Sequence, residues 1–340
     1  MDELLFIYLI IISLNLLFYF KLSKISVYLN IYDYPDNLRK LHKNKTPIIG
    51  GIFNCIFVSI LILFSNQFYL LLFVILFTFV GVYDDKYSIT PTSRLILFSL
   101  FVFLFSFFEK DFLIQVLFFK SIEKSIDLNV FSFPITILCV LLLTNALNMI
   151  DGTNGLCSIF KISSLIIIFL YLIFAENNGL LNQQYLYNLS FLKNLILIYL
   201  IILSIFTIFN LQGKIFLGDA GVYLSASVIS YILILINKIS SNFTTEVIFI
   251  IFLLPGIDML RVFSLRLINK KNPLRGDRNH LHHLLLEKIS NNKVITIFIL
   301  YQIISILSYV ILNNFFITLF AAILTYLIII HKNNGFLFKN

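Results

Sequence analysis

Long apolar runs recur along the whole chain and limit its fold more than any other feature. About 11 runs of roughly 16 to 21 residues, each long enough for a helix to cross about 30 Å of hydrocarbon, are separated by polar stretches. None alternates with the period of two that marks an outer-membrane barrel. With 59% hydrophobic and only 12% charged residues, the chain has too much apolar sequence for a soluble core. The sequence therefore predicts an all-α polytopic membrane protein with about 10–11 transmembrane helices.

The expected spans have no linker or internal repeat between them. Their approximate ranges are 4–21, 48–64, 67–83, 93–108, 134–150, 155–175, 191–209, 220–237, 246–265, 294–312 and 314–331. The first follows Asp2 and Glu3 and has no small-residue cleavage site after it, so we interpret it as a retained span and not as a signal peptide. We expect a single integral-membrane domain over 1–340, with the motif region within 33–283 and C-terminal helices over 294–331.

Positive charge is divided unevenly between the two sides of the expected bundle. With the N-terminus outside, the inner segments are 22–47, 84–92, 151–154, 210–219, 266–293 and the tail from 332. They hold about 20 of the 25 Lys and Arg, which the positive-inside rule places in the cytoplasm. These segments also carry most of the polar motifs, so the active-site cleft is expected on the cytoplasmic face.

Two of the motifs are charged segments at span ends. In "YDYPDNLRKLHKNKTPIIGG" (32–51), Lys45 and other basic residues precede a glycine pair. A topology signal or binding to anionic headgroups would explain the basic residues. Close helix packing would explain the glycine pair. "GVYDDKYS" (81–88) ends an apolar run with Asp84 and Asp85. Adjacent carboxylates raise each other's pKa unless a cation or several donors compensate them. In isolation the pair is typical of a solvated turn. Because it directly ends an apolar helix here, the position favours a role in metal binding or proton transfer.

A polar stripe interrupts the apolar sequence at "TNALNMIDGTNGL" (144–156). Asn145, Asn148, Asp151 and Asn154 follow one another at three-residue steps, which keeps them along one helical stripe. Hydrogen bonding between packed helices would explain the asparagines. It would not explain Asp151, because a carboxylate without a partner charge costs free energy at such a position.

A short loop, "GKIFLGDAG" (213–221), contains Lys214 and places Asp219 between small residues just before a span. An N-cap and a magnesium ligand are equally good explanations of this aspartate, since Mg²⁺ takes one or two carboxylates plus substrate phosphates.

The longest polar segment, "PGIDMLRVFSLRLINKKNPLRGDRNHLHHLL" (255–285), is strongly basic. Asp258 and Arg261 are three residues apart, so they can pair on one helix face. The histidines that follow have no Cys or further spaced ligand beside them, so an anionic ligand fits this segment better than zinc does. Carboxylates at several helix ends together with a basic loop provide what phosphoryl transfer requires, and the membrane setting implies a lipidic substrate.

Several motifs, taken in order, resemble the polyprenyl-phosphate N-acetylhexosamine-1-phosphate transferase superfamily: D-x-P, R-K-x-H, P-x-x-G-G, D-D, N-x-x-N-x-x-D-G, K-I-F-x-G-D-x-G, P-x-x-D and R-N-H-x-H-H. The resemblance covers residues 33–283. It implies an enzyme on the cytoplasmic face of the bacterial inner (plasma) membrane that uses Mg²⁺, with Mn²⁺ as an alternative. The enzyme would transfer an N-acetylhexosamine-1-phosphate, most simply that of N-acetylglucosamine, from a UDP-sugar to undecaprenyl phosphate and release UMP. The implied partners are these two substrates and the lipid bilayer, with no nucleic acid; homodimer formation is left open.

The resemblance also implies roles for individual residues. Asp84, Asp85 and Asp151 would be catalytic, with Asp84 or Asp85 deprotonating or orienting the lipid phosphate, and Asp219 and Asp151 would be metal ligands. The residues implied in substrate binding are Lys45, Asn148, Asn154, Lys214, Arg275, Asn279, His280, His282 and His283.

One departure from the family pattern concerns Asn154, which replaces the second acid of the usual D-G-x-D-G. Asn still offers an oxygen to a metal but cannot accept a proton, so a base role there is in doubt. The H-L-H-H order resembles the branch that starts O-antigen, enterobacterial antigen or teichoic acid; the muramoyl-pentapeptide transferases of peptidoglycan synthesis are the alternative. A polytopic transporter is another alternative, but most ionisable residues gather at span ends and not at the midplane. A catalytically silent homologue is the last alternative, and the presence of Asp84, Asp85, Asp151 and Asp219 argues against it.

Overall fold

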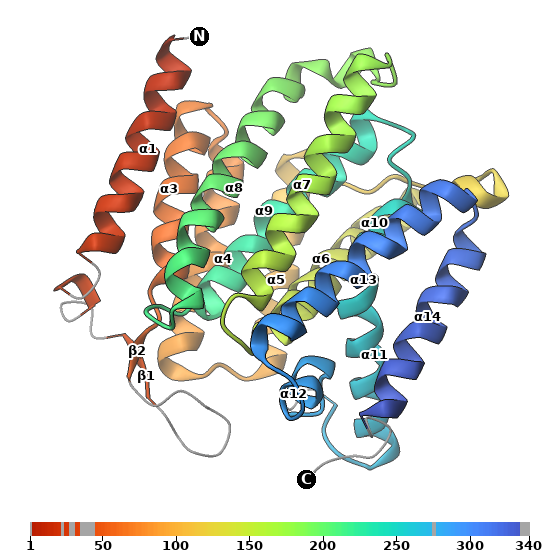
Figure 1. Ribbon diagram of the computed structural model, residues 1–340. Coiled ribbons are helices and arrows are strands. Elements are labelled where there is room, and N and C mark those ends of the chain that lie inside the picture. Colours follow the sequence, from red (N-terminus) through yellow and green to blue (C-terminus); the bar gives the residue numbers. More distant parts are fainter. Residues whose placement is uncertain (1, 22–23, 27–30, 35–44, 274–276, 334–340) are drawn as a thin grey trace.

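The computed structural model describes residues 2–21, 24–26, 31–34, 45–273 and 277–333, so Arg275 lies outside the described residues. Long helices lie side by side and run up and down through the molecule (Figure 1). They are α1 (Asp2–Phe20), α3 (Gly50–Phe64), α4 (Phe68–Tyr87), α5 (Pro91–Phe108), α6 (Ser132–Ile150), α7 (Leu156–Asn177), α8 (Leu189–Leu211), α9 (Gly218–Ile239), α11 (Leu253–Ile268), α13 (Asn291–Leu312) and α14 (Phe315–Lys332). This arrangement confirms the predicted all-α class.

The predicted spans all overlap helices, but their lengths differ. Within the described residues, eight helices are long and apolar enough to cross a membrane, and the bent pair formed by α10 (Thr245–Ile251) and α11 would make a ninth. The described apolar parts of the first two predicted spans, Tyr8–Phe20 and Gly50–Phe64, are shorter.

The apolar run predicted as one span over 246–265 forms two helices, α10 and α11, which meet at an angle of 72°. Pro255 explains the break: a proline ring clashes with the carbonyl four residues earlier, here that of Ile251, where α10 ends. Pro255 itself lies in the first turn of α11, where its missing N–H costs nothing. The Gln302 side chain of α13 donates to the Ile251 carbonyl oxygen (3.1 Å), which satisfies a group that the broken helix leaves free.

Helix α9 forms the centre of the bundle, and 94% of its most apolar stretch is buried. It packs against α3, α4 and α6. A Cβ added to Gly51 of α3 would overlap the backbone of Gly221, and one added to Gly81 of α4 would overlap the backbone of Ala220. The expected role of the glycine pair in close helix packing is therefore what the structure shows at Gly51.

The two ends of the bundle are closed by short elements. At one end, β1 (Tyr32–Asp33) pairs with β2 (Thr46–Pro47), and α12 (Leu281–Leu286) lies at the same end, beneath α13 (Figure 1). We call this end, where α4 and α6 finish and α9 begins, the polar end. At the other end, β3 (Val116–Phe119) and β4 (Lys124–Asp127) form a hairpin, and its Ser121 N–H donates to buried Glu246 of α10 (3.1 Å). The short helices η1 (Lys110–Phe112), η2 (Lys120–Ile122), η3 (Asn129–Phe131) and η4 (Gln183–Asn188) complete the connections.

Candidate active site

Asp85, Asp151 and Asp219 are distant in the sequence, but they line one cavity where α4 and α6 end and α9 begins. The Asp85 carboxylate accepts hydrogen bonds from the backbone N–H groups of Asp219 (2.9 Å) and Ala220 (3.2 Å). These N–H groups belong to the first turn of α9, the positive end of its dipole, which favours a negative partner. Asn148 of α6 donates to the Asp219 carboxylate (2.6 Å). Gly218 precedes them with φ of 72°, and a Cβ at this position would overlap Asp85, so the turn requires glycine.

Asp84 faces a different set of partners from Asp85. Its carboxylate is buried and pairs with Arg94 of α5 (3.0 Å), while the Tyr223 hydroxyl of α9 donates to the same oxygen (3.0 Å). Arg94 also donates to the Tyr223 hydroxyl (2.9 Å), which closes a triangle of polar groups. Arg94 was missed by the sequence reasoning; the signal was a lone arginine in the first turn of an apolar span.

The turn that follows α6 is fixed by residues of α8 and α13. The Asn210 side chain accepts from Gly155 N–H (2.6 Å) and donates to the Ile215 carbonyl (2.7 Å), so it ties the turn to the loop before α9. Asn291 donates to the backbone carbonyl of Asn154 (2.7 Å). Gly155 has φ of 84°, a conformation that glycine adopts without strain.

A cavity of about 260 Å³ opens between these elements. We call it the acidic cavity, because its polar lining includes Asp33, Asp85, Asp151, Asn154 and Asp219. Burial raises the pKa of the Asp151 carboxyl to about 6, and the positive charge of Lys161 opposes that rise. Lys161 is fully buried beneath the turn, where its ammonium group donates to the Ser225 hydroxyl of α9 (2.8 Å).

A second cavity of about 420 Å³ lies on the other side of the same turn, and Asp151 and Gly152 line both. Its walls are largely apolar, with Phe98, Leu141 and Phe263 among them. We call it the mixed cavity. Its polar lining residues are Arg94, Thr144, Asn145, Asn148, Asp151, Tyr223, Arg266, Asp277, His280 and His283.

The histidines lie over the Asp151–Gly152 turn. A Cβ added to Gly152 would overlap the His282 ring at Nε2, so the close approach needs a glycine at this position. Burial lowers the pKa of His282 well below its ordinary value and that of His283 to about 4, and both rings are therefore neutral at pH 7. Among the described residues, neither nitrogen of His282 has a hydrogen-bond partner, nor does Nδ1 of His283. Buried polar atoms of this kind are costly unless a ligand or water satisfies them.

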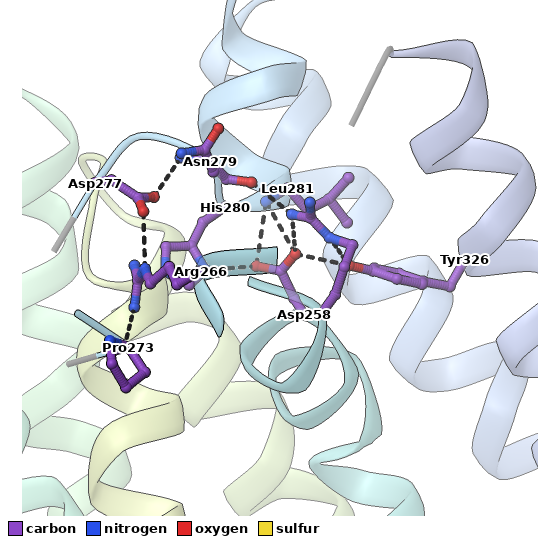
Figure 2. Close-up of polar contacts among 9 residues, drawn as sticks. Asp258, Arg266, Pro273, Asp277, Asn279, His280, Leu281 and Tyr326 are labelled. Carbon is purple, nitrogen blue, oxygen red and sulfur yellow. Dashed lines mark hydrogen bonds and ion pairs between the residues drawn. The ribbon is translucent and has the colours of Figure 1, made fainter. Parts of the chain in front are cut away.

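Arg266, one of the basic residues of the 255–285 segment that were expected to bind an anionic ligand, lies on α11 and is a further functional candidate. Its Nε donates to Asp277 (2.8 Å) and its Nη1 to the Pro273 carbonyl (2.8 Å), as Figure 2 shows. Its Nη2 is buried and has no partner within the described part of the chain. Because Arg266 lines the mixed cavity, this nitrogen is a donor available to an anion there.

Three further residues expected at the site line neither cavity. Lys45 lies over the Tyr32 ring (5.0 Å to its centroid) and Lys214 beside the Phe209 ring (6.0 Å), and neither lines the acidic or the mixed cavity. Asn279 is buried and does not line them either; its backbone N–H donates to Asp277 (2.8 Å).

The described residues contain no cluster of three or more His, Cys, Asp or Glu side chains placed to hold a metal ion. This leaves room for Mg²⁺, which usually takes one or two carboxylates and completes its octahedron with water and substrate phosphates. Asp151, Asn154 and Asp219 supply hard oxygen donors to one cavity, so the donor set fits such an ion.

The fold and the paired cavities define a polytopic membrane protein with an acidic site at one end of its helix bundle. The model of glycosyl transferase family 4 matches residues 67–237. The chain belongs to this family, and the transporter alternative is thereby set aside.

Several curated relatives align over most of the chain. The undecaprenyl-phosphate alpha-N-acetylglucosaminyl 1-phosphate transferase of Yersinia pestis is 28% identical over 84% of this chain and 76% of its own length. The protein of the same name from Escherichia coli K12 is 25% identical over 79% of this chain and 73% of its own length. A probable undecaprenyl-phosphate N-acetylglucosaminyl 1-phosphate transferase of Bacillus subtilis is 25% identical over 78% of this chain and 72% of its own length.

Proposed function

We propose that the protein transfers an N-acetylhexosamine-1-phosphate, most simply that of N-acetylglucosamine, from a UDP-sugar to undecaprenyl phosphate and releases UMP. The reaction would take place on the cytoplasmic face of a bacterial inner membrane, as the first membrane step of a cell-surface polysaccharide. The names of the relatives support the substrate classes. The single observation that carries the proposal is the Asp151–Gly152 turn, because it is shared by an acidic cavity and by a cavity with largely apolar walls.

The mixed cavity suits the phosphate end of a polyprenyl lipid. Arg94 reaches it with a side chain that is 25% exposed, while Asp84 and Tyr223 hold the guanidinium from behind. A third cavity, of about 290 Å³ and almost wholly apolar, borders it along α6, α9, α10 and α11; Leu142, Met259 and Leu260 line both. An isoprenoid chain could occupy this apolar cavity while Arg94 binds its phosphate.

The UDP-sugar would lie between the acidic cavity and the histidine segment. Nη2 of Arg266 and the unpartnered ring nitrogens of His282 and His283 are the donors and acceptors that a diphosphate or a sugar would satisfy. Asp151 and Asp219, with the Asn154 amide, are the residues that would hold Mg²⁺, and Mn²⁺ suits the same oxygens. The bound ion would neutralise negative charge on the diphosphate oxygens.

The described contacts support separate tasks for the adjacent aspartates. Asp84 orients Arg94, and through it the lipid phosphate, since its carboxylate is already paired with the guanidinium. Asp85 holds the first turn of α9, and this contact places Asp219 in the acidic cavity. An oxygen of the lipid phosphate then forms a bond to the sugar-linked phosphorus, while the bond from that phosphorus to the bridging oxygen breaks and UMP leaves with the oxygen. One phosphoanhydride replaces another, so the chain must position and stabilise charge and needs no covalent intermediate.

The proposal is tested with purified protein, undecaprenyl phosphate, Mg²⁺ and UDP-N-acetylglucosamine that carries tritium in the sugar. We expect label to enter the lipid phase with equimolar UMP, and EDTA to abolish the transfer. Asp219→Ala should lower the rate by at least about 100-fold, as expected where electrostatic stabilisation dominates. Near-native turnover by this variant would contradict the metal assignment. Absence of transfer by the unaltered protein, with every N-acetylhexosamine offered, would contradict the function.

A further inference from the structure

Asp258 of α11 is a buried carboxylate that lines neither the acidic nor the mixed cavity, yet it has more polar contacts than most residues that do (Figure 2). One oxygen accepts from Arg261 (2.9 Å), from the Tyr326 hydroxyl of α14 (2.8 Å) and from Leu281 N–H (3.1 Å). The other lies 2.8 Å from Nδ1 of His280 and 3.2 Å from the same Leu281 nitrogen. A buried carboxylate is tolerated when it is paired and fully hydrogen-bonded, as it is here.

The Asp258–Arg261 pair holds three successive residues of the histidine segment. Arg261 donates to the Asn279 carbonyl, while Asp258 binds the His280 ring and the Leu281 N–H. The segment 279–281 is therefore fixed by its backbone at both ends and by a side chain in the middle. Asp258 and Arg261 lie about one turn apart on α11, so the orientation of that helix sets the position of the histidines.

The contact to Nδ1 determines which nitrogen of His280 can serve a ligand. Asp258 is a carboxylate and can only accept, so Nδ1 carries the proton and Nε2 is the nitrogen left for the mixed cavity that His280 lines. A histidine whose tautomer and ring plane are set by a carboxylate behind it needs no reorganisation when a substrate arrives.

Tyr326 brings the last described helix into the same network. Its hydroxyl donates to Asp258 (2.8 Å) and accepts from Nε of Arg261 (2.7 Å), so it bridges the pair. The tyrosine is buried, although most of α14 is exposed on its outer side. Tyr326 lines neither the acidic nor the mixed cavity, and the described polar contacts of its hydroxyl are those with Asp258 and Arg261.

We propose that Asp258 is a positioning residue, which fixes the tautomer and orientation of His280 for the substrate, and that Tyr326 ties α14 to the same task. The proposal rests on the proposed function for its kinetic consequences but not for its structural ones.

The kinetic test uses Asp258→Asn, His280→Gln and the double variant in the transfer assay. Each single change is expected to lower kcat/KM by about 10- to 100-fold, the range found when a residue that orients a ligand is altered. Since Asp258 acts through His280, the double variant should be no slower than His280→Gln alone. Tyr326→Phe should have a smaller effect in the same direction. Multiplying losses in the double variant would overturn the proposal.

Glu246 provides a matched control for unfolding. It is a buried carboxylate on α10, the other half of the bent pair, and it accepts from a tyrosine hydroxyl, that of Tyr309 (2.7 Å). Glu246→Gln should lower thermal stability about as much as Asp258→Asn while leaving kcat/KM unchanged. Equal kinetic losses in the two variants would show that Asp258 is only a structural group.

A measurement without turnover separates this inference from the proposed function. The chain has five histidines, so nitrogen NMR of ¹⁵N-histidine-labelled protein, with His280→Gln to assign the signal, can report the His280 tautomer. We expect protonation at Nδ1 in the unaltered protein and a mixture of tautomers in Asp258→Asn. A signal from Nε2-protonated His280 in the unaltered protein would overturn the proposal even if transfer is observed, whereas failed transfer with the expected signal would contradict only the function.

Discussion

Asp84 and Asp85 show how far neighbouring residues can differ in environment. One carboxylate is paired with Arg94, and the other accepts two backbone N–H groups at the start of α9. The sequence predicts that adjacent carboxylates need compensation, and it could not say that each has its own. Tyr223 was out of reach because its partner Asp84 lies on a helix far away in the chain, whereas Arg94, a lone arginine at the start of the next helix, could have been noticed. The shared family pattern, by contrast, directed attention to Asp151, Asp219 and the histidines without any knowledge of distances.

Arg94→Gln tests the assignment of the lipid phosphate. Removing the guanidinium should raise the KM for undecaprenyl phosphate by about 10- to 100-fold, since a hydrogen bond to a charged group contributes roughly 1.5–3 kcal/mol. The KM for the UDP-sugar should change little. Because the change also leaves Asp84 buried without its cation, thermal unfolding must be measured in parallel. A rise confined to the UDP-sugar KM would move Arg94 to the other substrate.

Asp151 predicts an acid limb in the pH profile. Its carboxyl has a pKa of about 6 and must be ionised to hold a metal, so transfer should fall as pH drops through about 6. Bound Mg²⁺ favours the ionised form, and raising its concentration should therefore move the limb to lower pH. Rates measured at several Mg²⁺ concentrations test this coupling. A limb that does not move with the metal would argue against Asp151 as a ligand.

Gly152→Ala tests the contact between the turn and the histidines. The added methyl would overlap the His282 ring, so either the ring or the turn must move. We expect a loss in kcat/KM for the UDP-sugar of at least about tenfold, as misplacement by even 1 Å costs more than this in positioned sites. Global stability should fall less than activity. An alanine variant with unaltered kinetics would show that the histidines do not depend on this approach.

At the scale of elements, the site exists because α3 and α4 can approach the start of α9 closely. Gly51 and Gly81 permit this approach, and the backbone N–H groups that bind Asp85, those of Asp219 and Ala220, belong to the same turn of α9. Long apolar runs predict such helices well. The ends and bends of these helices depend on single residues. The break before α11 could have been predicted from Pro255. The side chain that donates to the freed Ile251 carbonyl could not, because Gln302 comes from α13.

Gly81→Ala should destabilise the bundle. Its methyl would meet the backbone around Ala220, which cannot rotate away, so we expect a loss of about 1–3 kcal/mol or more in unfolding free energy. Gly256→Ala is the control, because nothing lies within 4 Å of the added methyl and alanine favours helix. Unfolding of both variants in the same micelles gives the comparison. Equal stability of the two would mean that the approach of α4 to α9 is looser than described.

At the scale of the whole molecule, the apolar runs were sufficient to predict a helical membrane bundle, and the order of motifs was sufficient to predict its family. The paired cavities could not be predicted, since they depend on how the turn after α6 lies between α9 and α12. Lys45 and Lys214 illustrate the limit: both lie in the expected motifs, yet both contact aromatic rings and line neither cavity. A motif identifies a segment, and packing decides which of its side chains reach the site.

The central claim is that a phosphosugar, and not a sugar alone, passes to the lipid. The most direct test follows ³²P from UDP-N-acetylglucosamine labelled in either phosphate, with purified protein, undecaprenyl phosphate and Mg²⁺. We predict that label in the sugar-linked phosphate enters the lipid phase and that label in the uridine-linked phosphate appears in UMP. Release of both labels in water-soluble UDP, with the sugar alone on the lipid, would contradict the account.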